Sequence, residues 1–494
     1  MLVVAPTDVN CCKLRQPLFH LKSHSSEMTQ QFFIAMKIFI MPCTLPQHEQ
    51  KFLTPLKNVT VGKKYWLTAF PYWPIVLLLA SSLFAQTEKV RLDSLTFDRA
   101  VMLALEHHPS LKAAEANTRA SSAVLTQARA AYFPAVNLSS STTRTEGAFV
   151  FNPTFPPRDQ RYTNYVVSVQ AQQTLFDFGK TGGRVTANEN FVDAAASDAE
   201  ATRHNVIANV KLAYLNFIQT ERVVKVNEEA VAQAEQHLVR AKAFYSVGKR
   251  PEFDVTNAEV DLANAKVNLI RGRNLQRLAK VQLENAMGVH PAADYTVSAV
   301  FAIPPLPTTL DSAKALAFAQ RSELRSARAR LQANHALVSA AWNQHLPTLS
   351  AAGSYIWSAF DFPLFSRWNA GVTLSLPVFQ GFNLSAQVQQ AKANTDVAQA
   401  NLEVLTESIT LEVEQVYLSL QEANERITAT TKLVEQAEQN LKLAEARYNS
   451  GVGSAIEVTD AQLSRSNARI THIQAQYDYN SALVRLRRAL GVAE

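Results

Sequence analysis

The 494-residue sequence predicts an α+β membrane protein made of two tandem copies of one unit. Three observations lead to this prediction: an internal repeat, very long helical segments with a heptad pattern, and short segments that alternate apolar and small polar residues. Phe176, Tyr214 and Gly248 each meet an identical residue 203 positions later, and the alignment from Phe176 to Gly288 needs no gap. Self-similarity of this length indicates that a whole structural unit was duplicated.

The first part of the chain does not share this repeat. Residues 63–85 are predicted to be a signal peptide, because two lysines precede the apolar run Tyr65–Ala80 and small residues follow it. A single-pass membrane anchor is the alternative, since the run is nearly long enough to span a bilayer, but two prolines interrupt it. Residues 1–62 lie upstream of a normal signal peptide, and we expect them to be an extension from a start site placed too early.

Removing this leader changes what the composition implies. All three cysteines lie within it, so the remaining chain is expected to have neither disulfides nor a thiolate metal site. Residues 1–85 hold 8 Lys and Arg against 3 Asp and Glu, which leaves the rest of the chain close to neutral and gives no reason to expect nucleic acid as a partner. No sequence motif of an enzyme, a cofactor or a metal site is found, and the adjacent His107 and His108 would not share a helix face. We therefore expect no catalytic activity and no cofactor.

Each copy reads as a short helix, a helix, two strands, a very long helix and a long helix. Repeat one covers 95–288 and repeat two covers 310–491, joined by a proline-rich, extended linker at 289–309. The helices are expected at 96–107, 110–131, 181–246 and 252–288, and then at 310–321, 323–343, 383–449 and 455–490. The strands are expected within 132–176 and 346–379.

The very long helices carry an apolar seam with alternating steps of three and four residues. The seam comprises Val224, Asn227, Val231, Ala234, Leu238, Ala241 and Tyr245 in repeat one, and Ile427, Thr430, Val434, Ala437, Leu441, Ala444 and Tyr448 in repeat two. This spacing indicates left-handed coiled-coil packing. A helix of about 66 residues is about 100 Å long, and the second and fourth helices of a repeat would match that length if they stack end to end.

The predicted strands have one apolar face and one small polar face. Aromatic residues gather near their ends, namely Tyr132, Phe133, Phe149, Phe151, Phe176, Phe178, Phe360, Phe362, Phe365 and Phe379. A soluble sheet could contain one such strand, but four strands of this kind are typical of an outer-membrane β-barrel. Four strands are too few to close a barrel, and open edges cannot face lipid. The barrel is therefore expected to close by oligomerisation.

Four short motifs follow the strands and the long helices. The strand-to-helix junctions read Leu175–Gly179 (LFDFG) and Leu376–Gly381 (LPVFQG), and the helix tips read Tyr245–Gly248 before Asp254–Val255 and Arg447–Gly451 before Glu457–Ala461. With these motifs in this order, residues 95–491 resemble the TolC-type outer-membrane factor family. Members of that family are the exit ducts of tripartite efflux pumps and type I secretion systems.

The resemblance implies a homotrimer in the outer membrane of a Gram-negative cell, with a 12-stranded barrel in outer-membrane lipid and a 12-helix coiled-coil tube through the periplasm. It also implies that a periplasmic adaptor protein docks on the turns between the long helices and links them to an inner-membrane transporter of proton-driven or ABC type. These turns are Val247, Gly248, Lys249 and Arg250 in repeat one, and Gly451, Val452, Gly453 and Ser454 in repeat two. From the residues alone, the glycines simply let a helical hairpin reverse its direction.

By the same resemblance, Glu457, Asp460 and Tyr448 belong to the constriction of the pore. Glu457 and Asp460 are three residues apart and share one helix face, so three chains would form an acidic ring. A simpler interpretation is compatible with this one: carboxylates in the first turn of a helix offset the helix dipole, as Asp254 would also do. The chain departs from the family pattern at Gly453, where a gate-linking arginine can stand.

A periplasmic coiled-coil scaffold, anchored by residues 65–80 and without channel activity, is the alternative function. It accounts for the heptads of the long helices. It does not account for four alternating strands with aromatic ends, so an outer-membrane exit duct is the function that the sequence favours.

Overall fold

The computed structural model describes residues 94–149, 158–289, 295–298 and 309–492. The expected signal peptide at 63–85, the upstream segment 1–62 and the linker prolines lie outside these residues. Among the described helices, none combines the length and the apolar character needed to cross a membrane.

The described elements follow the same order in both halves of the chain. The first half contains α3 (Phe97–His107), α4 (Pro109–Ala130), β2 (Ala135–Phe149), β3 (Arg158–Phe176), α5 (Lys180–Ser246) and α6 (Glu252–Met287). The second half contains α7 (Leu310–Gln320), α8 (Ser322–Asn343), β5 (Thr348–Ala359), β6 (Phe365–Ser375), α9 (Asn383–Asn449) and α10 (Ala455–Ala489). The helix ends lie within one or two residues of those expected from the sequence.

The backbone repeats as regularly as the sequence does. Helices α5 and α9 both contain 67 residues, and their ends are 203 positions apart. Before α5 the chain passes through positive φ angles at Phe178 and Gly179, and before α9 it does so at Gly381 and Phe382. The same left-handed bend is thus made by Phe-Gly in one copy and Gly-Phe in the other, although a bulky residue is strained there.

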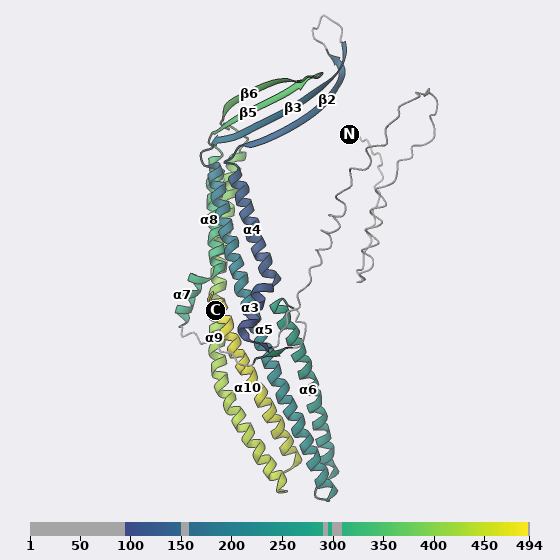
Figure 1. Ribbon diagram of the computed structural model, residues 1–494. Helices are drawn as coiled ribbons and strands as arrows, with labels where there is room; N and C mark the ends of the chain where they lie inside the picture. Colours follow the sequence, from purple (N-terminus) through teal and green to yellow (C-terminus); the bar gives the residue numbers. More distant parts are fainter. Residues whose placement is uncertain (1–93, 150–157, 290–294, 299–308, 493–494) are drawn as a thin grey trace, which may run out of the picture. The chain divides into compact units, whose positions relative to one another are not determined.

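The four longer strands form one antiparallel sheet in the order β2-β3-β5-β6 (Figure 1). Its register places the predicted apolar residues in rows across the sheet: Leu138, Val169, Tyr355 and Trp368 are successive cross-strand partners. The neighbouring row on the opposite face is polar and consists of Asn137, Gln170, Ser354 and Asn369. The alternation in the four strands therefore combines into one apolar and one polar face.

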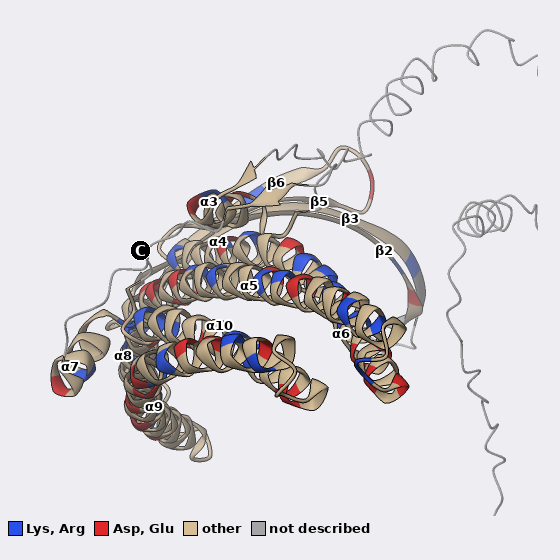
Figure 2. Ribbon diagram, turned by 90° about the horizontal axis from the view of Figure 1, so that it is seen from below, with Lys and Arg blue, Asp and Glu red and all other residues tan. Residues whose placement is uncertain are grey.

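The helices form a curved row when viewed along their length (Figure 2). Helix α5 contacts α4 and α6 on one side and α8 and α10 on the other, and α9 contacts α8, α10 and the short α7. The shorter helices stack end to end as expected. A Cβ atom on Gly288 would lie 2.8 Å from His108 Cα, where α6 meets α4, and one on Gly491 would lie 3.0 Å from the carbonyl carbon of Gln320, where α10 meets α8. Glycine at both joints permits this close approach.

The joint between α6 and α4 is apolar and was not fully predicted. Here β1 (Ser94–Leu95) pairs in parallel with β4 (Thr296–Val297), so the segment expected to be only an extended linker contributes a short strand. Tyr214 of α5 is completely buried beneath this pair and donates to the carbonyl oxygens of Leu95 at 3.1 Å and Ser298 at 2.7 Å. Two-residue pairing between segments so far apart leaves no periodic signal in the sequence.

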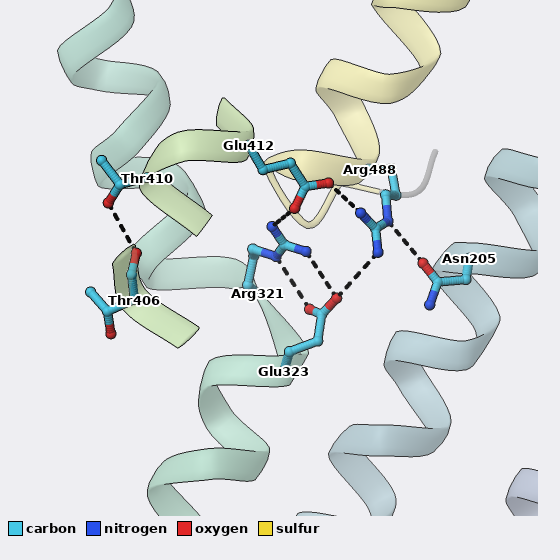
Figure 3. Close-up of polar contacts among 7 residues, drawn as sticks. All are labelled: Asn205, Arg321, Glu323, Thr406, Thr410, Glu412 and Arg488. Carbon is cyan, nitrogen blue, oxygen red and sulfur yellow. Dashed lines mark hydrogen bonds and ion pairs between the residues drawn. The ribbon is translucent and has the colours of Figure 1, made fainter. Parts of the chain in front are cut away.

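The joint between α10 and α8 is instead held by charge (Figure 3). The Arg321 guanidinium, in a residue only 3% exposed, donates to Glu412 at 2.5 Å and to both carboxylate oxygens of Glu323 at 3.0 and 3.3 Å. Arg488 of α10 also donates to Glu412, and to Asn205 of α5 at 2.8 Å. The network joins α5, α8, α9 and α10 at the point where one helix ends and the next begins.

The predicted seam is correct along α9 and shifted near the end of α5. Thr430, Ala437, Leu441, Ala444 and Tyr448 are all buried, as expected for α9. On α5, Tyr245 is exposed and Leu238 is only partly buried, whereas His237 is buried. The shift arises because α5 packs against several neighbouring helices, including α10 and α6, so its buried surface is wider than one coiled-coil stripe.

Candidate functional site at the helix tips

The two predicted docking turns close the hairpins α5–α6 and α9–α10. Gly248 and Gly451 occupy equivalent positions with φ of 73° and 84°, a conformation that favours glycine. In the first turn the Lys249 amide donates to the Phe244 carbonyl at 2.9 Å, and in the second the amides of Val452 and Gly453 donate to the Arg447 carbonyl at 3.1 and 2.9 Å. Val247 and Val452 are exposed, so each turn presents an apolar side chain to solvent.

Tyr448, predicted at the pore constriction, is packed between the two hairpins and is only 2% exposed. Its ring lies 5.5 Å from the His237 ring and 5.8 Å from the Phe244 ring, both on α5. The Arg250 guanidinium lies over the Tyr448 ring at 4.8 Å from its centroid. A side chain from repeat two thus fills the contact surface of repeat one, and its placement at a pore constriction stays a proposal.

Arg250 also joins the two turns directly. Its Nη2 donates to the Gly453 carbonyl at 2.8 Å, which connects two positions that are equivalent in the repeat. Gly453 is closely packed, because a Cβ there would lie 2.9 Å from both the Arg447 Cβ and the Tyr448 backbone nitrogen. The turn of repeat two therefore has no space for a side chain at 453, and an arginine from the turn of repeat one reaches it instead.

Asp254, in the first turn of α6, is more than a dipole partner. The residue is buried, and its Oδ2 has no hydrogen-bond partner among the described residues, which is also true of the Tyr448 hydroxyl. Burial raises the pKa of Tyr448 and the nearby Asp254 charge adds to this effect, while Arg250 opposes it. Tyr448, Arg250, His237 and Asp254 together form the tip cluster. Neither Asp254 nor His237 was assigned to it from the sequence.

Glu457 and Asp460 are both exposed near the start of α10, but they have different partners. Glu457 accepts a hydrogen bond from Arg447 Nε at 3.1 Å, and its backbone nitrogen donates to the Ser454 hydroxyl, which caps the helix. Asp460 makes no ion pair with any described residue. A compensating charge therefore lies close to Glu457 and none accompanies Asp460.

Replacing Arg250 by alanine should loosen the contact between the hairpins. The substitution removes a charged hydrogen bond and a cation–π contact, which together stabilise the contact by about 1–2 kcal/mol because the side chain is partly exposed. Backbone amides in the α5–α6 turn should then exchange with solvent about 5- to 30-fold faster in hydrogen-exchange mass spectrometry. Lys249→Ala is the matched control, and equal exchange in both variants would contradict a joining role for Arg250.

The fold and these tips define a class of protein: a chain with a four-stranded antiparallel sheet, apolar on one face, at one end of a set of long helical hairpins (Figure 1). The sequence profile of the family described as outer membrane efflux protein matches residues 100–289 and 315–492. The chain therefore belongs to the outer membrane efflux protein family, which confirms the resemblance found in the sequence, and it is a protein of the Gram-negative outer membrane.

Individual relatives agree with this assignment. The chain is 26% identical over 393 residues to Protein CyaE of Bordetella pertussis, covering 78% of this chain and 81% of that protein. It is 24% identical over 406 residues to Outer membrane protein TolC of Escherichia coli, covering 78% of this chain and 80% of that protein. The CmeC outer membrane channel of Campylobacter jejuni shares the fold with a TM-score of 0.73 at 20% identity, over 80% of this chain and 86% of that one. CmeC is named as a channel, and none of these three relatives is named as an enzyme.

Proposed function

We propose that three copies of this chain assemble into the exit duct of a tripartite efflux pump or type I secretion system. In this assembly three sheets close one 12-stranded barrel in the outer membrane, and the helices close a 12-helix tube in the periplasm. A periplasmic adaptor docks on the turns 247–250 and 451–454 and connects the duct to an inner-membrane transporter. The observation that carries the proposal is that the described part of the chain has two unpaired edges in its sheet and two in its row of helices.

The sheet supplies the first pair of edges. Among the described strands, β2 pairs only with β3 and β6 pairs only with β5, so each leaves a row of backbone donors and acceptors without a strand partner there. The outward residues of these strands include Leu138 on β2 and Trp368, Val372 and Leu374 on β6, all exposed. An apolar face suits lipid, but lipid does not satisfy an open edge. Pairing of β2 with β6 of another copy satisfies both conditions.

The two outer helices of the curved row form the second pair of unpaired edges. Helix α9 lies at one end of the curved row and α6 at the other (Figure 2). Val397, Val404, Leu411 and Leu418 follow each other on α9 at intervals of seven residues, and all four are exposed. A strict heptad of exposed apolar residues matches a coiled-coil partner. The α4–α6 side of the next copy, which carries exposed Val260, Val267 and Ile270, fits this role.

Mass measurement in detergent tests the assembly directly. The purified protein should have three times the mass of one chain, and it should form conducting pores in planar lipid bilayers. A stable monomer without conductance would favour the scaffold alternative, because a coiled-coil scaffold does not need a closed barrel.

The acidic ring is the second part of the proposal. Three copies of Glu457 and Asp460 would meet at one narrow mouth, where like charges at close range repel by about 1 kcal/mol or more per pair. Such a ring attracts cations, and salt weakens its effect. The double variant Glu457→Ala, Asp460→Ala should therefore lose cation preference and block by divalent cations in single-channel recordings.

The contacts of the two carboxylates sharpen this expectation. Because Arg447 pairs with Glu457, Asp460→Ala alone should produce most of the change in selectivity. Asp254 is an unsuitable control, since it is buried between the hairpins. Glu259→Ala is better matched, because Glu259 is an exposed carboxylate near the same end of α6 with Lys242 as its partner at 2.9 Å. Unchanged selectivity in the double variant would leave both residues as helix-dipole partners.

A further inference from the structure

His237 is a buried titratable group near the helix tips, and no part of the proposed function involves it. It lies on α5 and is only 2% exposed. Its ring packs at 5.5 Å and 56° against Tyr448 of α9, so it forms part of the contact between the hairpins α5–α6 and α9–α10. None of the hydrogen bonds among the described residues involves His237. A histidine in this position is held by packing and not by a polar partner.

Charged groups of both signs surround His237. Arg240 lies on its own helix, Asp254 and Asp261 lie on α6, and Glu445 lies on α9. Arg250 lies over the ring of the same Tyr448. Burial is the largest influence and lowers the pKa of His237, Arg240 lowers it further, and the three carboxylates oppose this shift without cancelling it. The packed arrangement therefore favours the neutral imidazole.

We propose that His237 makes the contact between the two hairpins sensitive to acid. As a neutral ring it fills the space between α5 and Tyr448. As a cation it places a charge without a hydrogen-bond partner in that contact, and the tips of the hairpins move apart to let water reach it. The proposal concerns packing within one chain, and it rests on the proposed duct only for its consequence, which is easier opening of the duct in an acidified periplasm.

The sign follows from the two protonation equilibria. A histidine whose pKa is lower in the packed state contributes its packing fully above the pKa of the separated state, about 6.5. That contribution is lost as the pH falls below this value, because only the separated state binds the proton readily. Between pH 7.5 and 5.5 the equilibrium should shift toward the separated arrangement by up to about tenfold.

Distances between the two turns measure this shift. Spin labels on cysteines placed at Lys249 and Val452, both exposed, report the separation of the hairpins by pulsed electron spin resonance, and no other cysteine lies beyond the expected leader. Labelled chains are mixed with an excess of unlabelled chains, so that each assembly carries one labelled copy. The full chain in detergent should lose short distances and gain long ones as the pH falls from 7.5 to 5.5.

Two variants separate protonation from packing. His237→Phe keeps a ring against Tyr448, and His237→Gln keeps a polar side chain, and neither can be protonated in this range. Both should abolish the acid response. His472→Gln is the control, because both ring nitrogens of His472 already have partners, Thr430 at 3.1 Å and Gln476 at 2.8 Å, in the α9–α10 hairpin. This control should respond to acid as the unmodified chain does.

The outcomes are distinct from those that test the duct. An acid response that persists in both His237 variants, no response in the unmodified chain, or shorter distances at low pH would each overturn the role of His237. Bilayer recordings of the same proteins then test the consequence: the open probability should rise at pH 5.5 in the unmodified chain and not in His237→Phe. Absence of any conductance at either pH would contradict the duct and leave the spin-label result standing.

Discussion

Aspartate at both Val404 and Leu411 is expected to leave the chain monomeric and without conductance. These two residues are 69% and 55% exposed in the single chain, and they are consecutive members of the apolar heptad on α9. Helix α9 contacts α8, α10 and the short helix α7, and the heptad residues remain exposed beside these neighbours in the described chain. If three copies close a ring, these side chains become buried against the next copy.

The expected effect is large because it recurs at every interface. A carboxylate buried in an apolar contact without a partner costs several kcal/mol, and closure of a trimer repeats that cost at three interfaces. A heterologous ring interface gives no compensation elsewhere, since the same two surfaces meet each time. Assembly should therefore fail completely instead of weakening gradually.

Mass measurement in detergent provides the test, with a control of equal charge. Val239 on α5 and Leu463 on α10 are 67% and 57% exposed, but their helices have neighbours on both sides within the chain. The double variant Val239→Asp, Leu463→Asp should remain a conducting trimer. A trimer in the α9 variant would mean that α9 does not face another copy, and the arrangement proposed for the tube would be wrong.

Periodic features of the sequence predicted the fold well. The duplication placed α9 at the same residues that the structure gives, because an ungapped repeat transfers the ends of one helix to the other. The alternation in four strands predicted a sheet with one apolar face, and the register confirms it in the row from Leu138 to Trp368. Non-local features were missed, including the pairing of β1 with β4 and the charges at the α8–α10 joint. Such contacts connect single residues far apart in the chain, and no period marks them.

The tip cluster shows the same limit at the candidate site. Tyr448, Glu457 and Asp460 were found because they belong to a motif, whereas the contacts of Arg250 were not foreseen although the residue was named in a turn. His237 did carry a signal: it is three residues after Ala234 and four before Ala241, both of which are buried. A polar residue at a heptad step is a candidate for a specific role. The predicted seam contained the neighbouring Leu238 in its place.

Replacing Arg321 by methionine is expected to destabilise the helical part by about 1–3 kcal/mol. The Arg321 guanidinium is shared by Glu412 of α9 and Glu323 of α8, and Arg488 of α10 completes a network of two positive and two negative charges (Figure 3). Methionine fills much of the same volume but leaves two carboxylates facing one arginine. The loss is thus the cost of an uncompensated charge on partly buried carboxylates, 27% and 29% exposed, and not the loss of a favourable contact alone.

Thermal unfolding of the protein in detergent at several pH values tests this origin. Burial alone would raise the pKa of Glu323, but the hydrogen bond and charge of Arg321 outweigh it and hold that pKa below its usual value. A carboxyl with a lowered pKa stabilises the fold fully above its unfolded pKa, about 4.3, and this contribution is lost as the pH falls through the folded pKa. The stability difference between Arg321→Met and the unmodified chain should therefore be largest near neutral pH and shrink below about pH 4.3. Lys432→Met, which removes the exposed partner of Glu435, should change stability little at any pH. A difference for Arg321→Met that stays constant with pH would indicate lost packing, and not charge, as the cause.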